Sequence, residues 1–176
     1  MRPTGRLRWL LPALLACVLS CQTRESEPAL DALEARTVTG QVRIFLIAPE
    51  DAGASGREVA GCRDSVVPVV VTLPRPQPAL EGSLQALLDL HGNRHAPATG
   101  HYNALYASPL TVESIDRNGA EVRVYLKGYL EVEDACDGSR ALAQLTETAL
   151  QFPDVSRAQF LLGGRPLNGL LPRAKR

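Results

Sequence analysis

The chain has 176 residues, with 19 lysine and arginine residues against 19 aspartate and glutamate residues. Three of the basic residues, Arg2, Arg6 and Arg8, lie in the first 20 positions, where there is no acidic residue, so 16 basic and 19 acidic side chains follow. This slightly acidic balance excludes a basic field for nucleic acid, and the residues beyond position 40 suffice for one hydrophobic core but hardly for two.

Residues 1–20 have the pattern of an export signal. An apolar run at residues 9–19 follows the arginines, and it is too short to cross a bilayer as a permanent helix. The residues that close it, Val18-Leu19-Ser20-Cys21, resemble the lipobox of bacterial lipoproteins. The resemblance implies that residues 1–20 are removed and that Cys21 is acylated, which makes the protein a membrane-anchored lipoprotein outside the cytoplasm.

Two alternatives remain open for this segment. The run that ends at Cys17 is a rival lipidation site with a shorter apolar run, and an ordinary signal cut beside a chance cysteine would carry no lipid. Lipidation matters because each buried acyl methylene contributes about 0.8 kcal/mol, so two chains anchor a protein durably. Gln22 follows Cys21, and the sorting pattern that this resembles favours the outer membrane in a cell with two membranes.

Residues 21–40 are predicted to form a lipidated cysteine and polar tether, because few large apolar side chains occur there. The folded domain is predicted to begin at Gln41. Residues 42–47 are almost continuously apolar, which predicts a strand that is covered on both faces. Residues 65–73 contain five valines and predict a second strand, in which Pro68 indicates an edge position or a bulge.

The next two elements have clear periodicity. A leucine stripe predicts a helix that starts near Pro78 and ends at His91-Gly92; its members are Leu80, Leu84, Leu87 and Leu88. Residues 93–106 form an irregular loop. The dipeptide Asn118-Gly119 predicts a hairpin between strands at residues 110–117 and 120–126.

A second helix is predicted over residues 139–152, with Asp137 or Ser139 as its N-cap and Pro153 as its stop. Residues 155–162 predict a last strand, followed by a turn at residues 163–166. The element order predicts an α/β (α+β) two-layer sandwich, with one mixed sheet of about five strands and both helices on one face.

Cys62 and Cys136 are the two cysteines that remain once Cys17 leaves with the signal and Cys21 is acylated. In an oxidising compartment an even pair predicts a disulfide. Two free thiols or a two-ligand metal site are the alternatives, and neither has supporting neighbours in the sequence.

The pattern over residues 41–167 resembles the GerMN domain, the sporulation and spore germination family. The most specific segment is 141–155, where Ala-Leu-Ala-Gln-Leu-Thr-Glu-Thr-Ala-Leu-Gln-Phe-Pro-Asp-Val is followed by Phe160-Leu-Leu-Gly-Gly-Arg-Pro. The resemblance implies a role in complex assembly or in spore and cell-wall processes. Residues 168–176 are predicted to form a basic C-terminal tail, because Arg173, Lys175 and Arg176 cluster there. Two features depart from the family pattern: the loop at residues 93–106 and the cysteine pair.

No catalytic set is found, so the protein is predicted not to be an enzyme and to need no cofactor or metal. His91, His95 and His101 lack ligand neighbours and are interpreted as solvated loop residues, and residues 53–56 lack the context of a nucleophile elbow. Four acidic residues near Cys136 lack a calcium-loop pattern and are interpreted as a solvated loop; they are Glu131, Glu133, Asp134 and Asp137.

Tyr102 and Tyr106, in the irregular loop, are the candidate binding residues, because an exposed tyrosine pair suits contact with a glycan or a protein. Packing of the two rings onto the domain is the alternative. The sequence thus predicts a lipid-anchored, non-catalytic envelope protein that binds an envelope protein or a cell-wall component. A membrane-presented glycan or small-ligand binding module is the alternative, and a hydrolase is disfavoured.

Overall fold

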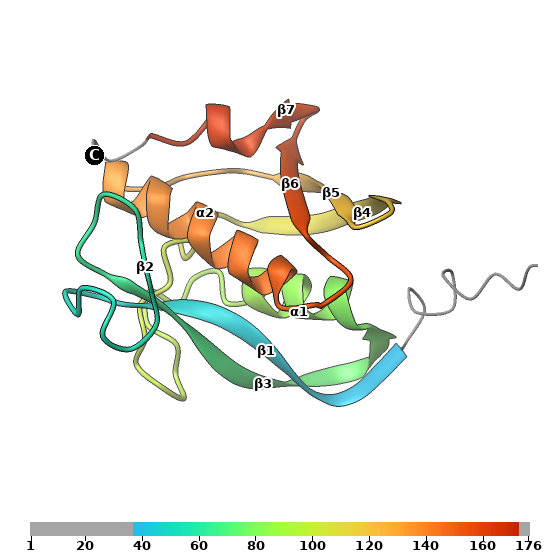
Figure 1. Cartoon of the computed structure of the whole chain (residues 1–176), viewed down its shortest axis with the longest axis horizontal. Helices are drawn as coiled ribbons and strands as arrows, with labels where there is room; N and C mark the ends of the chain where they lie inside the picture. The colour runs from blue at the N-terminus through green and yellow to red at the C-terminus, as the bar shows by residue number, and fades with distance from the viewer. Residues whose placement is uncertain (1–36, 173–176) are drawn as a thin grey trace, which may run out of the picture.

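The computed structural model describes residues 37–172. The predicted lipidation site Cys21 therefore lies outside the described residues, as do most of the tether and the last four residues. The fold is α+β, with two helices packed between two sheets (Figure 1).

The first sheet is dominated by a long antiparallel pair. Strand β1 (Thr37–Ala48) pairs along most of its length with β3 (Ser65–Pro78), and the short strand β2 (Arg57–Glu58) pairs with the beginning of β3. The order is β1-β3-β2. Ile44 and Val69 face each other across β1 and β3 and are buried, as the apolar runs predicted.

The second sheet has the order β4-β5-β6-β7. Strands β4 (Leu110–Asn118) and β5 (Glu121–Gly128) form the predicted hairpin, whose turn holds Gly119 at a φ of 58°. That left-handed conformation favours glycine because it has no Cβ. Strand β6 (Arg157–Leu162) adds in parallel to β5, and β7 (Arg165–Pro166) returns after the predicted glycine turn.

Both predicted helices form, with shifted ends. Helix α1 (Ala79–Leu88) buries its leucine stripe, and α2 (Ala135–Leu150) begins four residues before its predicted start. The N-cap of α2 is Asp134, whose carboxylate accepts the Asp137 N–H at 2.8 Å. Asp137 and Ser139 were therefore wrong as caps, because the helix extends back to include Cys136. A 3-10 turn, η2 (Leu167–Gly169), packs against β6 at the end of the domain.

The predicted single sheet is divided in two, and the helices contact both parts (Figure 1). The reason lies at the edge of β1 that faces away from β3. There the Ile47 N–H and C=O pair with Tyr102, and the Phe45 N–H donates to Thr148 Oγ1. Gln144 Nε2 donates to the Phe45 carbonyl. Loop and helix groups thus occupy the place where another strand would pair.

Pro68 lies at a position of β3 where the backbone N–H would not pair with β1, so its missing N–H costs no hydrogen bond between these strands. It lies opposite Phe45, whose backbone N–H and C=O are turned toward α2 and not toward β3. In antiparallel pairs two opposite residues both point toward each other or both away, so Pro68 also points away from β1. The predicted edge position is confirmed, since β2 pairs only with Ser65 and Val66.

Candidate functional site

The loop at residues 93–106 is folded tightly onto the domain. Tyr102 exchanges two backbone hydrogen bonds with Ile47 of β1, each 2.9 Å long. Asn103 is fully buried, and its amide donates to the carbonyl oxygens of Leu90 and Asn93. The loop is therefore an ordered part of the domain. It is irregular only because it contains no long helix or strand.

Of the two interpretations of Tyr102, packing onto the domain is the one that the structure supports, since this residue is 6 % exposed. Its hydroxyl donates to both carboxylate oxygens of Asp137, at 2.8 and 2.9 Å. The physical reason is the pairing with Ile47, which draws the ring under the loop and toward the first turn of α2. Tyr102 therefore anchors the loop from below and presents no contact surface of its own.

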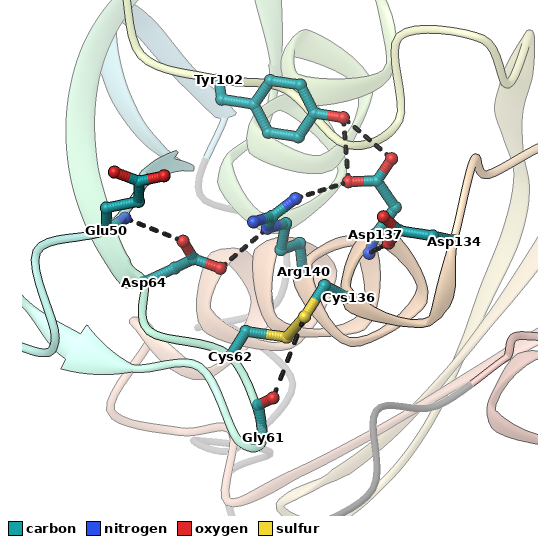
Figure 2. The surroundings of a disulfide bond; sticks show 9 residues. All are labelled: Glu50, Gly61, Cys62, Asp64, Tyr102, Asp134, Cys136, Asp137 and Arg140. Atoms are coloured by element: carbon teal, nitrogen blue, oxygen red, sulfur yellow. Dashed lines mark hydrogen bonds and ion pairs between the residues drawn. A yellow bond between two sulfur atoms is a disulfide. The ribbon is translucent and has the colours of Figure 1, made fainter.

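A chain of buried charges continues from Tyr102. Arg140 donates to Asp137 Oδ1 at 3.0 Å and to Asp64 Oδ2 at 2.8 Å, and both carboxylates are almost completely buried (Figure 2). Asp64 Oδ1 accepts the Glu50 N–H at 3.0 Å. The arginine thus bridges α2 to the segment just before β3, and the predicted solvated position of Asp137 is wrong.

The electrostatics of this chain favour the neutral tyrosine and the charged arginine. Burial raises the pKa of Tyr102, and the hydrogen bond to the Asp137 carboxylate raises it further. Burial alone would lower the pKa of Arg140, but the hydrogen bonds and charges of Asp64 and Asp137 outweigh it, so the pKa is raised. The Arg140 guanidinium also lies 5.4 Å from the centre of the Tyr102 ring.

The predicted disulfide between Cys62 and Cys136 is present and lies beside this chain (Figure 2). The two Cα atoms are 5.9 Å apart, within the ordinary range for a bridge. Cys62 lies two residues before Asp64, and Cys136 lies four residues before Arg140, so the bridge and the Arg140–Asp64 ion pair join the same two segments. A pocket of about 440 Å³ opens beside them, lined by both cysteines and Arg63 among others.

Above Tyr102 lies an outer layer, which we call the Arg94–Tyr106–Glu133 surface after its three residues. Arg94 forms an ion pair with Glu133 at 2.7 Å, and its guanidinium lies 5.2 Å from the Tyr106 ring centre and 5.7 Å from that of Tyr102. The Tyr106 hydroxyl also donates to Glu133. That hydrogen bond is the main cause that raises the pKa of Tyr106.

Tyr129 extends this surface, although it was not among the predicted binding residues. Its side chain is 61 % exposed. The segment 129–133 runs beside residues 106–109, because the Tyr129 N–H donates to the Pro109 carbonyl and the Glu131 N–H donates to Ser108 Oγ. The sequence signal that could have identified it is the alternation of Tyr129, Glu131 and Glu133 with the apolar residues between them. The structure exposes these three residues and half-buries the apolar ones.

The other sequence candidates do not converge. Within residues 37–172, no three histidine, cysteine, aspartate or glutamate side chains are placed to hold a metal ion. His91 and His95 contact the carbonyl oxygens of Leu88 and Gly100, and residues 163–166 form a turn and β7. The described helices are also too short to span a bilayer.

Comparison with known proteins assigns this chain to a family. The family described as "Sporulation and spore germination", named Germane, matches residues 49–168. No curated protein matches the chain. A solved structure of the tandem GerMN domains of the sporulation protein GerM from Bacillus subtilis is 11 % identical with a TM-score of 0.46, over 71 % of this chain and 39 % of that one.

A second solved structure, of a candidate lipoprotein from Clostridium perfringens, is 13 % identical with a TM-score of 0.39, over 80 % of this chain and 89 % of that one. The chain thus spans well under half of the tandem GerMN structure but most of the Clostridium protein. The family match covers both helices, the disulfide and every strand except β1, which ends just before the match begins. The chain therefore belongs to the Germane family of sporulation and spore germination domains.

Proposed function

We propose that this protein is a lipid-anchored envelope protein whose Germane domain binds another envelope component and catalyses no reaction. Cys21 would carry the lipid, and residues 22–36 would hold the domain away from the membrane. The disulfide supports a location of the protein outside the cytoplasm, because such bonds persist mainly in oxidising compartments. In a cell with two membranes, Gln22 after the lipidated cysteine favours the outer one.

The proposal that the domain catalyses no reaction rests on the buried chain of charged and polar groups from Tyr102 to Asp64. Each charged or ionisable group in it is bound to another: Tyr102 to Asp137, Asp137 to Arg140, and Arg140 to Asp64. A general acid or nucleophile has to reach a substrate, and these groups are turned toward one another. They fit a structural support better than a catalytic centre.

The binding face that we propose is the Arg94–Tyr106–Glu133 surface together with Tyr129. Tyrosine and arginine are enriched at protein interfaces because their large side chains combine apolar area with hydrogen-bonding groups. Here the buried Tyr102 and the paired segments hold the surface in place before a partner arrives. A surface that is already ordered loses less conformational entropy on binding.

The proposal is tested by photo-crosslinking of the full chain in its native envelope. A photoreactive phenylalanine analogue replaces Tyr129 or Tyr106, and the same analogue at Gln159, an exposed residue of β6, is the matched control. We expect one protein adduct from the two tyrosine positions and none from Gln159. Equal adducts from all three positions would refute this face.

The membrane-presented glycan binder is separated by a second measurement. The full chain with Cys21→Ser is incubated with purified cell-wall fragments. Saturable binding that Tyr129→Ala weakens, in the absence of any protein adduct, would replace the protein partner by a wall glycan. Absence of both signals would refute the binding function at this surface.

A further inference from the structure

A pocket of about 310 Å³ lies where the first part of β1 meets the start of α1 and the end of α2. Its apolar lining includes Val42, Val70 and Phe152. Val70 is 57 % exposed, so part of this apolar lining is open to solvent. Concave and mostly apolar sites of this kind are where proteins bind other groups.

Two polar residues of the pocket lack partners within residues 37–172. Ser83 of α1 is fully buried, and no described residue pairs with its hydroxyl. Arg43 is exposed, and its guanidinium forms no ion pair with an acidic side chain in the same part of the chain. Buried hydroxyls are nearly always paired, and a guanidinium binds carboxylates well. The pocket therefore suits an apolar side chain that has backbone groups and a carboxylate beside it.

The segment that precedes β1 in the sequence has this chemistry. It lies outside the described residues, so the following is read from the sequence alone. Leu30 and Leu33 are the only large apolar residues within positions 22–36. An acidic residue follows each of them, Asp31 after the first and Glu34 after the second. The tether thus carries twice the combination of an apolar side chain and a neighbouring carboxylate.

This tether joins the domain beside the pocket. Thr37, the first residue of β1, pairs with Pro78, and the next residue is Ala79, which begins α1 and lines the pocket (Figure 1). The Cα atoms of Thr37 and Ala79 are therefore within roughly 10 Å of each other. Leu33 is four residues before Thr37, and four residues span about 13 Å when extended or about 6 Å as a helical turn. Leu33 is thus within reach of the pocket.

We propose that residues 29–36 fold back onto the domain and place Leu33 in this pocket. The carboxylates of Asp31 and Glu34 then lie near the unpaired guanidinium of Arg43, and the backbone of the segment supplies a partner for the Ser83 hydroxyl. Because the segment is covalently attached next to its site, its effective concentration there is high, and a small contact suffices to hold it.

Docking also sets how the domain faces the membrane, a consequence that rests on the proposed lipid at Cys21. Residues 22–28 alone then link the anchor to the domain, and they span at most about 25 Å. Tyr102 pairs with Ile47, ten residues beyond the first residue of β1 and roughly 33 Å along the strand. The proposed binding face therefore lies toward the end of the domain that is turned away from the bilayer.

The test uses the purified full chain with Cys21→Ser, which removes the proposed lipid, and a photoreactive leucine analogue in place of Leu33. We expect illumination to join position 33 to the lining of the pocket, at Val70 or Phe152 of the same chain, as mapped by mass spectrometry. Mixing isotope-labelled and unlabelled chains separates adducts within one copy from adducts between copies. The same analogue at Ser26, in the tether but outside the docking segment, is the matched control and should give no adduct at the pocket.

Charge reversal tests the role of Arg43. Arg43→Glu should lower the yield of the adduct roughly two- to fivefold, the effect of an exposed ion pair, and Asp31→Arg with Glu34→Arg should restore it in that background. Arg123→Glu, at an exposed position of β5, makes the same change of charge away from the pocket and should leave the yield unchanged.

The reciprocal experiment places the analogue at Val70 of the lipidated chain in its native envelope. An adduct within residues 29–36 is expected, whereas an adduct with another protein or with a lipid would overturn docking of the tether. Adducts from position 33 that join two copies, equal adducts from positions 26 and 33, or no adduct at the pocket would overturn it as well. None of these results requires a folded Arg43→Glu variant or depends on whether Cys21 is acylated, so failure of the docking and failure of the lipid anchor are distinguishable.

Discussion

Gln144 of helix α2 binds the backbone of Phe45, which precedes it by 99 residues. Its Nε2 donates to the Phe45 carbonyl at 3.2 Å, and its Oε1 accepts the Ala104 N–H at 2.8 Å. Thr148 follows on the same face of α2 and accepts the Phe45 N–H, and Gln151, the C-cap of the helix, donates to the Arg43 carbonyl. A polar stripe on a helix thus satisfies a strand edge, and the fully buried Gln144 is its centre.

Gln144→Leu should lower the free energy of unfolding by about 2–4 kcal/mol. The substitution retains the size of the side chain but leaves the Phe45 carbonyl and the Ala104 N–H without a partner, and each such loss costs about 1–3 kcal/mol. Urea denaturation followed by circular dichroism measures the change. Gln159→Leu, at an exposed position on β6, is the control and should stay within about 0.5 kcal/mol.

Arg140→Met should be more damaging, at about 3–5 kcal/mol, because Asp64 and Asp137 would remain buried without their cation. The same denaturation experiment measures it. Combining Arg140→Met with Asp64→Asn and Asp137→Asn removes the two uncompensated charges and should recover part of the loss. A single Arg140→Met variant as stable as the parent chain would contradict a structural role for the buried chain.

Stability should decline in alkaline solution through Tyr102. The folded-state pKa of Tyr102 is raised, chiefly by burial, so its contribution is complete below the unfolded value of about 10. Above that pH the unfolded chain binds fewer protons than the folded one, and stability falls by up to about 1.4 kcal/mol per pH unit. Tyr102→Phe cannot ionise and should reduce this slope.

The measurement is the free energy of unfolding at a series of pH values from neutral to above 10. Val70→Ala changes an exposed side chain that does not ionise, and it should retain the slope of the parent chain. Equal slopes for Tyr102→Phe and the parent chain would show that Tyr102 does not account for the decline.

The bridge between Cys62 and Cys136 spans a sequence separation of 74 residues and should contribute about 4 kcal/mol on the chain-entropy model. Reduction should therefore lower the Tm by roughly 10–15 °C. A thiol titration of denatured, unreduced protein should find neither Cys62 nor Cys136 free. Cys62→Ala with Cys136→Ala should reproduce the reduced Tm without added reductant, which separates loss of the bridge from other effects of the reagent.

Cys21→Ser should abolish labelling by a radioactive fatty acid and release the protein from membranes, because the thiol is the proposed acylation site. Cys17→Ser is the matched control and should be labelled like the parent chain. The reverse pattern would move the anchor to Cys17, and labelling of neither parent nor variants would leave an ordinary cleaved signal.

The elements with strong periodicity could be predicted from the sequence. The leucine stripe of α1 and the glycine-containing hairpin between β4 and β5 depend on local patterns, and both form as expected. The division into two sheets could not be predicted, since strand patterns show that an edge exists and not what covers it. Gln144, Thr148 and Gln151 look like an ordinary polar face of a helix until β1 is placed beside them.

The candidate site was predicted in part. The cysteine pair followed from its number and the expected compartment, and the bridge is confirmed. The burial of Tyr102 and Asp137 could not be predicted, because it depends on Arg140 and Asp64, which are 76 residues apart in the sequence. Tyr106 remains at the surface, where its binding role is still a prediction.

The dependence of β1 on α2 also affects the order in which the chain can mature. Synthesis delivers β1 long before Gln144 and Thr148, so the growing chain carries an uncovered strand edge until most of the domain has been made. Contacts between residues so far apart in the sequence form slowly, and chains with an exposed strand edge are prone to aggregate before those contacts form. A chaperone that holds the nascent β1–β3 hairpin would therefore raise the yield of native protein more than one that acts on the finished domain.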